Sequence, residues 1–381
     1  MALGVPPALA QGASRPVRSV RTIGLARGVD GPRRLRSQGR AMMRGMKAKV
    51  SRRAFVAATA GAGVLASRSS AAPTSATRLP REVWVASIDL KDLYPETSVE
   101  RRIERTLERM QNVVAFRPDI VCLPETFNTS WVRTEKPIAE LAEEVPGPLT
   151  KRMGEYAKAN ACYVICPILT RSQGRIYNSA VLLDRTGAVA GTFHKIHPTE
   201  GEMDDGVWPG PLEPPVWQTD FGKVGIQICY DANWFQSWRS LKSRGAEIVF
   251  FPSQFPGGRI LTTHAWMNQM YIVSSTGEDA RVIDISGDDL ASSGPFERWV
   301  AAPVNLEKAL VHIWPEVQRF GDIRKKYGRR VRIKIWHPEN WATIESLDAD
   351  LKVMDVLKEF GLPTYQDHIS KADGAQKAKR S

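Results

Sequence analysis

Two short runs rich in apolar residues restrict the folds open to this chain. Residues 121–123 are all apolar, and residues 224–228 are apolar or Gly apart from Gln227. Runs with so little alternation of polar and apolar residues are typical of strands that are covered on both faces. The sequence therefore predicts an α/β fold with internal strands.

The segments around these runs alternate between strand and helix patterns. Strand patterns occupy residues 82–90, 161–168 and 176–183, whereas Thr97 and Glu100 form a predicted capping box for a helix. The apolar residues of that helix fall on one face, and no Pro/Ser-rich linker interrupts the pattern. We therefore expect one α/β domain over residues 80–312.

Three residues with chemically active side chains each follow a strand-like segment: Glu125, Lys195 and Cys229. A thiol is a good nucleophile only as the thiolate, so Cys229 needs a nearby base, and Glu125 is the candidate. Attack on a carbonyl carbon builds negative charge on its oxygen, which Lys195 and the backbone N–H of Tyr230 could stabilise. Together they form a candidate centre for covalent catalysis through a thioester.

The order of further motifs between residues 83 and 306 resembles the nitrilase superfamily of carbon–nitrogen hydrolases. These motifs are Tyr177-Asn178-Ser179-Ala180, Asp184-Arg185-Thr186-Gly187, Trp208-Pro209-Gly210 and Phe221-Gly222-Lys223-Val224-Gly225. Glu125, Lys195 and Cys229 follow one another in the family's order and at fitting distances. The resemblance implies a four-layer αββα sandwich and a hydrolase of non-peptide carbon–nitrogen bonds, for which we expect no cofactor and no metal.

Family members also use a second glutamate shortly after the lysine. Here it would be Glu202 or Glu200, and the distance to Pro209-Gly210 favours Glu202. Its expected role is to hold Lys195 and Glu125 in register through hydrogen bonds.

The resemblance leaves the cleaved bond open. Tyr230-Asp231 after the cysteine is similar to the amidase and ureidase branches, whereas nitrile-cleaving members usually have Trp-Glu there, so an amide or ureide is the first choice. A nitrile is the alternative, and a non-catalytic binding protein with the same fold is another. Contacts to the small-molecule substrate are expected from Trp131, Tyr230, Asn233 and Trp234.

Substrate charge is a separate expectation. Family members that act on acidic amides commonly place Arg three or four positions after the nucleophile, where this chain has Ala232 and Asn233. An uncharged or aromatic amide is therefore expected. His264 or Arg259 could still supply a cation.

The basic character of the chain belongs to its first 80 residues. The whole chain has a net charge of +12, but residues 1–80 carry 15 Lys and Arg and a single acid, which leaves the rest at −2. The part of the chain after residue 80 is nearly neutral, so it lacks the excess of positive charge that binding to nucleic acid requires. We expect no nucleic-acid partner.

This basic leader contains the parts of a twin-arginine signal. Arg52 and Arg53 precede a weakly apolar stretch at 57–66 and small residues at 69–72. A membrane anchor would need about 20 apolar residues, so no stable membrane insertion is expected. The prediction is a signal at 46–76, export to the periplasm or medium, and residues 1–45 that are unstructured or precede the true start.

Two expectations concern the remaining residues. The cysteines other than Cys229 lie in apolar segments, so they are expected to be buried and unpaired, without metal-ligand spacing. Residues 313–381 are expected to form a helical extension, with helices at 315–327 and 346–360 and a disordered tail after His368. By the resemblance, such an extension packs across a subunit interface in a homodimer or larger homo-oligomer.

Overall fold

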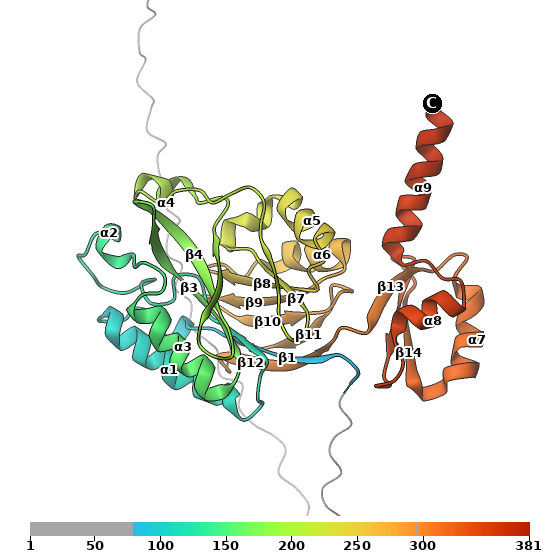
Figure 1. Cartoon of the computed structure of the whole chain (residues 1–381), viewed down its shortest axis with the longest axis horizontal. Coiled ribbons are helices and arrows are strands. Elements are labelled where there is room, and N and C mark those ends of the chain that lie inside the picture. The colour runs from blue at the N-terminus through green and yellow to red at the C-terminus, as the bar shows by residue number, and fades with distance from the viewer. Residues whose placement is uncertain (1–78, 295) are drawn as a thin grey trace, which may run out of the picture. The chain divides into compact units, whose positions relative to one another are not determined.

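The computed structural model describes residues 79–294 and 296–381 of the 381-residue chain (Figure 1). The predictions for residues 1–45 and for the signal at 46–76 lie outside these residues. Within them, no helix is both long and apolar enough to cross a membrane.

Two six-stranded mixed sheets form the centre of the described chain. The first sheet has the order β12-β1-β2-β3-β4-β5 and the second has the order β11-β10-β9-β8-β7-β6. The strands of the first sheet are β1 (Glu82–Ile88), β2 (Ile120–Cys122), β3 (Tyr163–Ser172), β4 (Arg175–Leu183), β5 (Val189–His194) and β12 (Trp299–Asn305). Those of the second are β6 (Val216–Gln218), β7 (Lys223–Ile226), β8 (Ile248–Ser253), β9 (Tyr271–Thr276), β10 (Ala280–Ile283) and β11 (Asp289–Ser292).

Each sheet has a parallel centre, formed by β1, β2 and β3 in the first and by β7, β8 and β9 in the second. The carboxyl ends of parallel strands lie along one edge of a sheet, where their loops can build a site. The two edges are joined by Ser275, whose hydroxyl oxygen lies 2.6 Å from the carbonyl oxygen of Ile88 and 3.1 Å from that of Cys122. This contact links the strand ends of one sheet to those of the other.

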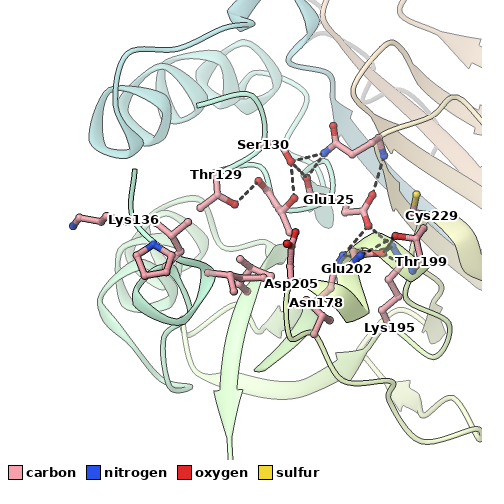
Figure 2. A pocket seen from close by; sticks show the side chains of 17 residues that line it. Glu125, Thr129, Ser130, Lys136, Asn178, Lys195, Thr199, Glu202, Asp205 and Cys229 are labelled. Carbon is pink, nitrogen blue, oxygen red and sulfur yellow. Dashed lines mark hydrogen bonds and ion pairs between the residues drawn. The ribbon is translucent and has the colours of Figure 1, made fainter. Parts of the chain in front are cut away.

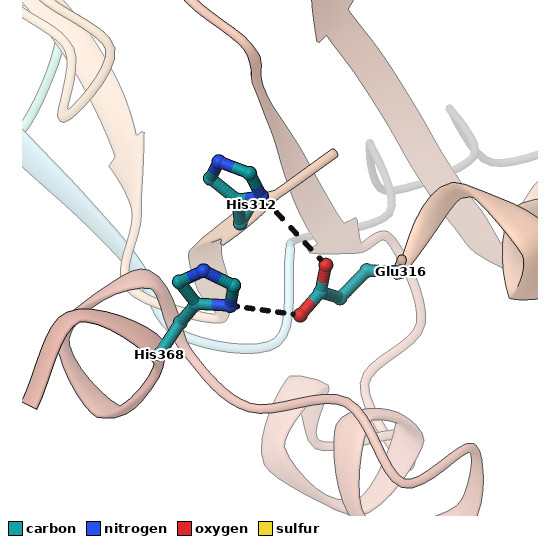
Figure 3. A group of neighbouring side chains, drawn as sticks. All are labelled: His312, Glu316 and His368. Carbon is teal, nitrogen blue, oxygen red and sulfur yellow. Dashed lines mark hydrogen bonds and ion pairs between the residues drawn. The ribbon is translucent and has the colours of Figure 1, made fainter. Parts of the chain in front are cut away.

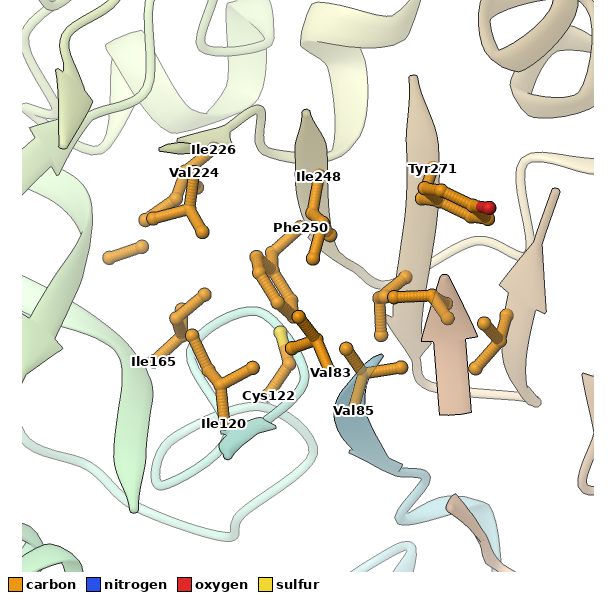
Figure 4. Close-up of a cluster of buried hydrophobic side chains, with 14 of the residues drawn as sticks. Val83, Val85, Ile120, Cys122, Ile165, Val224, Ile226, Ile248, Phe250 and Tyr271 are labelled. Atoms are coloured by element: carbon orange, nitrogen blue, oxygen red, sulfur yellow. The ribbon is translucent and has the colours of Figure 1, made fainter. Parts of the chain in front are cut away.

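An apolar core fills the space between the sheets (Figure 4). Val85 and Ile120 of the first sheet and Ile226 and Phe250 of the second belong to this buried cluster. Because the strands are also covered on their outer faces, their segments are apolar with little alternation.

Helices cover both outer faces. The first sheet packs against α1 (Val99–Val114) and α3 (Pro148–Asn160), and the second packs against α5 (Phe235–Ser243) and α6 (Gly258–Asn268). The architecture is the four-layer αββα sandwich that the resemblance implied. Short helical elements in the connections are η1 (Lys91–Leu93), α2 (Ile138–Leu141), α4 (Glu200–Asp204) and η2 (Cys229–Asn233).

The start of α1 differs from the predicted capping box. Ser98 is the N-cap, and its hydroxyl accepts a hydrogen bond from Arg101 N. Thr97 lies one residue earlier, where its own N–H and hydroxyl bind the carboxylate of Glu96. The prediction of Thr97 as the cap was wrong by one residue, because Ser98 is an equally good N-cap residue even though Arg101, three positions later, does not complete a capping box.

The C-terminal part is not wholly helical, in contrast to the prediction for 313–381. A three-stranded sheet of order β13-β15-β14 contains β13 (Lys308–His312), β14 (Val331–Trp336) and β15 (Trp341–Ser346). Its helices are α7 (Val317–Tyr327), η3 (Gly328–Arg330), α8 (Val353–Glu359) and α9 (Tyr365–Arg380). The sheet crosses the predicted boundary at residue 312.

Two predictions for this part were wrong for identifiable reasons. Residues 346–352 are not helical, because Ser346 ends a strand that pairs on both sides. The tail after His368 is helix α9 rather than disordered, and Thr364 caps it by accepting a hydrogen bond from Asp367 N. The polar composition of the tail hid this cap.

Candidate active site

A cavity of about 720 Å³ opens where loops from both sheets meet (Figure 2). Glu125, Lys195, Glu202 and Cys229 all line it. Glu125 follows β2 and Lys195 follows β5 in the first sheet, whereas Cys229 follows β7 in the second. The four residues that the sequence analysis proposed for catalysis are thus together at one end of the cavity.

Cys229 lies in a sharp turn after β7. Its φ of 49° falls in the left-handed region, which costs a non-glycine residue of order 1–3 kcal/mol and is found where the surrounding structure enforces it. The fully buried carboxylate of Asp231 holds the turn by accepting from Ile228 N at 3.1 Å and from His197 N at 2.8 Å. The cysteine turn is therefore tied to the segment that carries Lys195.

The carboxylate of Glu125 is held by three donors. Its Oε1 accepts from Lys195 Nζ and from Asn178 Nδ2, both at 2.7 Å, and its Oε2 accepts from Gln254 N at 3.0 Å. The first two donors come from the same sheet as Glu125 and the third follows β8 of the other sheet. Such a set of bonds fixes the carboxylate in one orientation.

Lys195 is almost fully buried between two carboxylates. Its Nζ lies 2.7 Å from Glu125 Oε1 and 2.7 Å from Glu202 Oε2. Burial alone would lower the pKa of Lys195, but the charges of Glu125, Cys229 and Glu202 raise it well above the ordinary value. Lys195 is therefore a permanent cation at the inner end of the cavity.

Glu202, rather than the exposed Glu200, is the glutamate in contact with Lys195. It also accepts from Asn178 Nδ2 at 2.7 Å and from Thr199 N at 2.8 Å, the latter within the capping box of α4. Burial raises the pKa of Glu202, but Lys195 and these hydrogen bonds outweigh burial and lower it. The carboxylate is ionised at neutral pH.

The thiol of Cys229 is neutral in the resting site. Burial and the negative charge of Glu125 raise its pKa to about 12, although Lys195 acts in the opposite direction. Cys229 must therefore lose its proton during attack, and a base has to lie in the same cavity. Glu125 lines that cavity.

Two positioning residues, Asn178 and Gln254, were not proposed from the sequence. The amide of Asn178 donates to both Glu125 and Glu202, and the side chain of Gln254 donates to the carbonyl oxygen of Glu125 at 2.6 Å. Asn178 lies in one of the motifs that carried the resemblance, which is the signal that could have revealed it. For Gln254 the only signal is its place directly after the strand-like run that ends at Ser253.

The four residues proposed for substrate contact do not line this cavity. Trp131 is 66% exposed and packs on Tyr94, with ring centroids 5.8 Å apart. Trp234 stacks on His197 at 3.8 Å. Tyr230 packs edge-on against Trp234, and Asn233 donates to the carbonyl oxygen of Tyr230. Tyr230, Asn233 and Trp234 thus contact one another and His197 around the cysteine turn, whereas Trp131 lies beside Tyr94.

His264 and Arg259, the two residues considered as a source of positive charge for an acidic substrate, do not line the cavity either. His264 is fully buried against Trp238, and burial lowers its pKa to about 4, so it is neutral. Arg259 lies in the exposed first turn of α6.

Comparison with known proteins identifies the family. The family model described as carbon-nitrogen hydrolase matches residues 85–308, which is more than half of the chain. The chain belongs to the carbon-nitrogen hydrolase family, and the catalytic candidates all lie within the matched range.

Individual relatives are more distant. A beta-ureidopropionase of Arabidopsis thaliana is 34% identical over 147 residues, which cover 36% of this chain and 36% of the plant protein, so the match spans about a third of that relative. A nitrilase of Pyrococcus abyssi is 30% identical over 187 residues, covering 47% of this chain and 70% of that protein. A crystal structure of an amidase from Nesterenkonia sp. aligns with a TM-score of 0.52 at 16% identity, covering 58% of this chain and 90% of that one, a likeness of fold.

Proposed function

We propose that this protein hydrolyses small carboxylic amides through a thioester on Cys229. The observation that carries the proposal is the buried ion cluster of Lys195 between Glu125 and Glu202 in the cavity that also holds the thiol. Paired ions of this kind also occur for structural reasons, but here they face a cavity together with a thiol, and a nucleophile beside a carboxylate and a cation is the combination that covalent catalysis needs.

The first half-reaction releases ammonia or an amine. Glu125 accepts the Sγ proton as the sulfur attacks the carbonyl carbon of the amide, and Lys195 donates a hydrogen bond to the oxyanion. Glu125 then passes the proton to the nitrogen, the C–N bond breaks, and the acyl group remains on sulfur. The fixed orientation of the Glu125 carboxylate suits both proton transfers.

The second half-reaction consumes water. Glu125 takes a proton from a water molecule as the oxygen attacks the thioester carbon, and the C–S bond breaks. The proton returns to Sγ, which releases the carboxylic acid and restores the neutral thiol. The net reaction converts an amide and water into an acid and ammonia or an amine.

The other end of the cavity favours an uncharged, apolar acyl group. Its wall contains the apolar side chains of Ile138, Leu141, Leu169 and Val207. Of its two lining lysines, Lys195 is paired with two carboxylates and Lys136 is exposed, so neither is a buried anchor for a substrate carboxylate. A ureide is the second candidate, favoured by the relative named beta-ureidopropionase.

Ammonia release from a matched panel tests this proposal. The panel pairs a straight-chain aliphatic amide with the amide of equal length that ends in a carboxylate, and adds an N-carbamoyl amino acid and the corresponding nitrile. The neutral amide is expected to have the highest kcat/KM, and Cys229→Ala is the blank. A tenfold preference for the carboxylate-bearing amide, about 1.4 kcal/mol of transition-state free energy, would contradict the apolar acyl site.

Export and assembly complete the proposal. The paired Arg52 and Arg53 support export by the twin-arginine route, and replacing both with Lys is expected to retain the precursor in the cytoplasm. Fractionation and N-terminal analysis of the exported protein, expected to begin between residues 71 and 77, test this. Light scattering at micromolar concentration tests the proposed homo-oligomer, which a monomer would contradict.

A further inference from the structure

Three side chains of types that bind metals meet in the C-terminal part of the chain (Figure 3). His312 ends β13, Glu316 precedes α7, and His368 lies in the first turn of α9. Glu316 Oε1 lies 3.1 Å from His368 Nδ1, and Glu316 Oε2 lies 3.9 Å from His312 Nδ1. His368 lies more than 50 residues from the other two, so no local spacing in the sequence indicates a site.

A buried carboxylate oxygen without a hydrogen bond points to a ligand in this cluster. Glu316 is 4% exposed, and its Oε2 has no hydrogen-bond partner among the described residues. A buried polar atom without a partner is costly, and for a carboxylate oxygen the cost is greater because of its charge. Figure 3 shows one carboxylate oxygen directed at each histidine, so a cation between the three groups would satisfy both oxygens.

Both histidines present Nδ1 to the Glu316 carboxylate, and one ring must turn out of the stack for both nitrogens to bind one ion. The two rings are stacked with centroids 4.3 Å apart, and the ligand atoms of all three residues lie within 4.8 Å of one another. His312 Nε2 is 2.9 Å from the side-chain amide of Asn340. The amide atom nearest to Nε2 is Asn340 Nδ2, so Nε2 accepts this hydrogen bond and Nδ1–H donates to the carbonyl oxygen of Trp314 at 2.7 Å. Metal binding through Nδ1 requires the amide to turn over, so that its oxygen accepts from Nε2–H and Nδ1 presents its lone pair. The metal would replace the contact of Nδ1 with the backbone of Trp314.

We propose that His312, Glu316 and His368 bind a divalent transition metal, with zinc as the best match. Two imidazole nitrogens and one carboxylate are a ligand set that zinc accepts with water as the fourth ligand. Water can enter from a cavity of about 620 Å³ lined by Glu316 and His368. Arg319 and Lys371 line the same cavity, but both are exposed, so solvent screens their charge.

The metal would anchor the last helix of the chain. Helix α9 has 16 residues and none of them is buried, so packing contributes little to its position. Its first turn touches the small sheet through Tyr365, whose ring lies 4.8 Å from that of Trp341, and through His368, which stacks on His312 of β13. A metal would add bonds from His368 to the end of β13 and to Glu316.

Zinc binding to the full chain tests the site independently of catalysis. The measurements use the Cys229→Ala protein, so that the active-site thiol cannot bind zinc, after treatment with a chelator. Calorimetric titration is expected to show one zinc equivalent, with a rise in Tm of about 3 °C or more at saturation. Cobalt should bind at the same site and show the visible absorption bands of a cobalt ion with a low coordination number.

Variants of the ligands decide the outcome. His368→Ala is expected to weaken zinc binding at least tenfold, and Glu316→Gln should do the same, whereas His337→Ala, at an exposed histidine of the same region, should leave it unchanged. Should Glu316→Gln fail to fold by circular dichroism, His368→Ala alone decides, because α9 has no buried residue. The proposal is overturned if no zinc binds to the Cys229→Ala protein, or if His368→Ala binds it as tightly.

Discussion

Within the described residues, Lys195 and Lys308 are each held between two carboxylates with little exposure to solvent, but of the two only Lys195 lines the cavity that contains Cys229. Lys195 lies 2.7 Å from both Glu125 and Glu202, beside Cys229. Lys308 lies 2.8 Å from Asp284 and 3.9 Å from Glu345, where the second sheet meets the small C-terminal sheet. None of these last three residues lines the cavity that holds Cys229.

The difference shows that a buried lysine–carboxylate cluster does not by itself indicate catalysis. Both clusters satisfy the same electrostatic requirement, that a buried charge be paired. What separates them is the space beside the ions and the presence of a nucleophile. The Lys308 cluster joins two parts of the fold, whereas the Lys195 cluster faces a cavity in which a substrate can contact it.

The largest expected effect is the loss of the nucleophile. Cys229→Ala should reduce kcat by at least about 10⁴-fold, because removal of a nucleophile that works with its base as one unit costs that much or more. Ammonia release measures the loss, and a thermal melt shows whether the fold is retained. Cys162→Ala, at a buried cysteine outside the cavity, is the control. More than about one hundredth of wild-type activity in Cys229→Ala would exclude covalent catalysis by this residue.

Replacement of each lysine by Met tests the comparison directly. Lys195→Met should lower kcat by at least about 10²-fold, because the oxyanion loses a charged donor. Lys308→Met should lower the free energy of unfolding by about 3–5 kcal/mol, because the buried carboxylate of Asp284 loses its cation, while kcat of the folded protein stays the same. Glu345 retains its ion pair with Arg332. Denaturant titration and turnover at a temperature where both variants are folded separate the two effects. A lower kcat in folded Lys308→Met would contradict the assignment of the Lys308 cluster to stability and of the Lys195 cluster to catalysis.

The Glu125→Gln variant should change activity and cysteine acidity in opposite directions. Turnover should fall by about 10²–10⁴-fold with the loss of the general base. The pKa of Cys229, which burial and the charge of Glu125 raise to about 12, should move down because one of these two causes is removed. The rate of alkylation by iodoacetamide as a function of pH measures it, with Glu200→Gln as the control. An unchanged or higher midpoint would show that Glu125 does not act on the thiol.

The smallest expected effect is on acid stability. Because the pKa of Glu202 is lowered in the folded state, its contribution to stability is present above the unfolded value near 4.5 and is lost as pH falls through the folded value. The free energy of unfolding of the wild type should therefore decrease more steeply below about pH 5 than that of Glu202→Gln. Denaturant melts across this range measure the two slopes, and parallel slopes would rule out this linkage. Glu200→Gln should follow the wild type.

Sequence patterns could identify the site residues that lie directly after a predicted strand. Glu125 and Cys229 come after apolar segments, and Lys195 comes after an expected strand, so their meeting at the sheet edges was predictable. Asn178 and Gln254 were missed because their roles depend on which strands are neighbours. Asn178 lies on β4 beside β5, and Gln254 reaches Glu125 from the other sheet. Such pairings are not encoded in a local pattern.

The C-terminal part was harder to predict because its local signals conflict. In β14 apolar residues alternate with Arg332 and Lys334, which is the period of a strand with one exposed face, but residues 313–381 were expected to form a helical extension. In α9 the polar composition concealed a capped helix.

The four residues expected to contact the substrate, Trp131, Tyr230, Asn233 and Trp234, were chosen because they lie close in sequence to Glu125 or Cys229. Closeness in sequence did not bring their side chains to the cavity.

Glu202 belongs both to the ion cluster and to the cap of α4, and this sharing has a consequence for dynamics. Helix α4 has five residues, too few to be stable alone, and the carboxylate that caps it through Thr199 is the one that binds Lys195. Opening of α4 therefore withdraws a counter-charge from the lysine, and protonation of Glu202 loosens the helix. Amide hydrogen exchange in residues 200–204 should consequently report the charge state of the active site, without any label placed inside it.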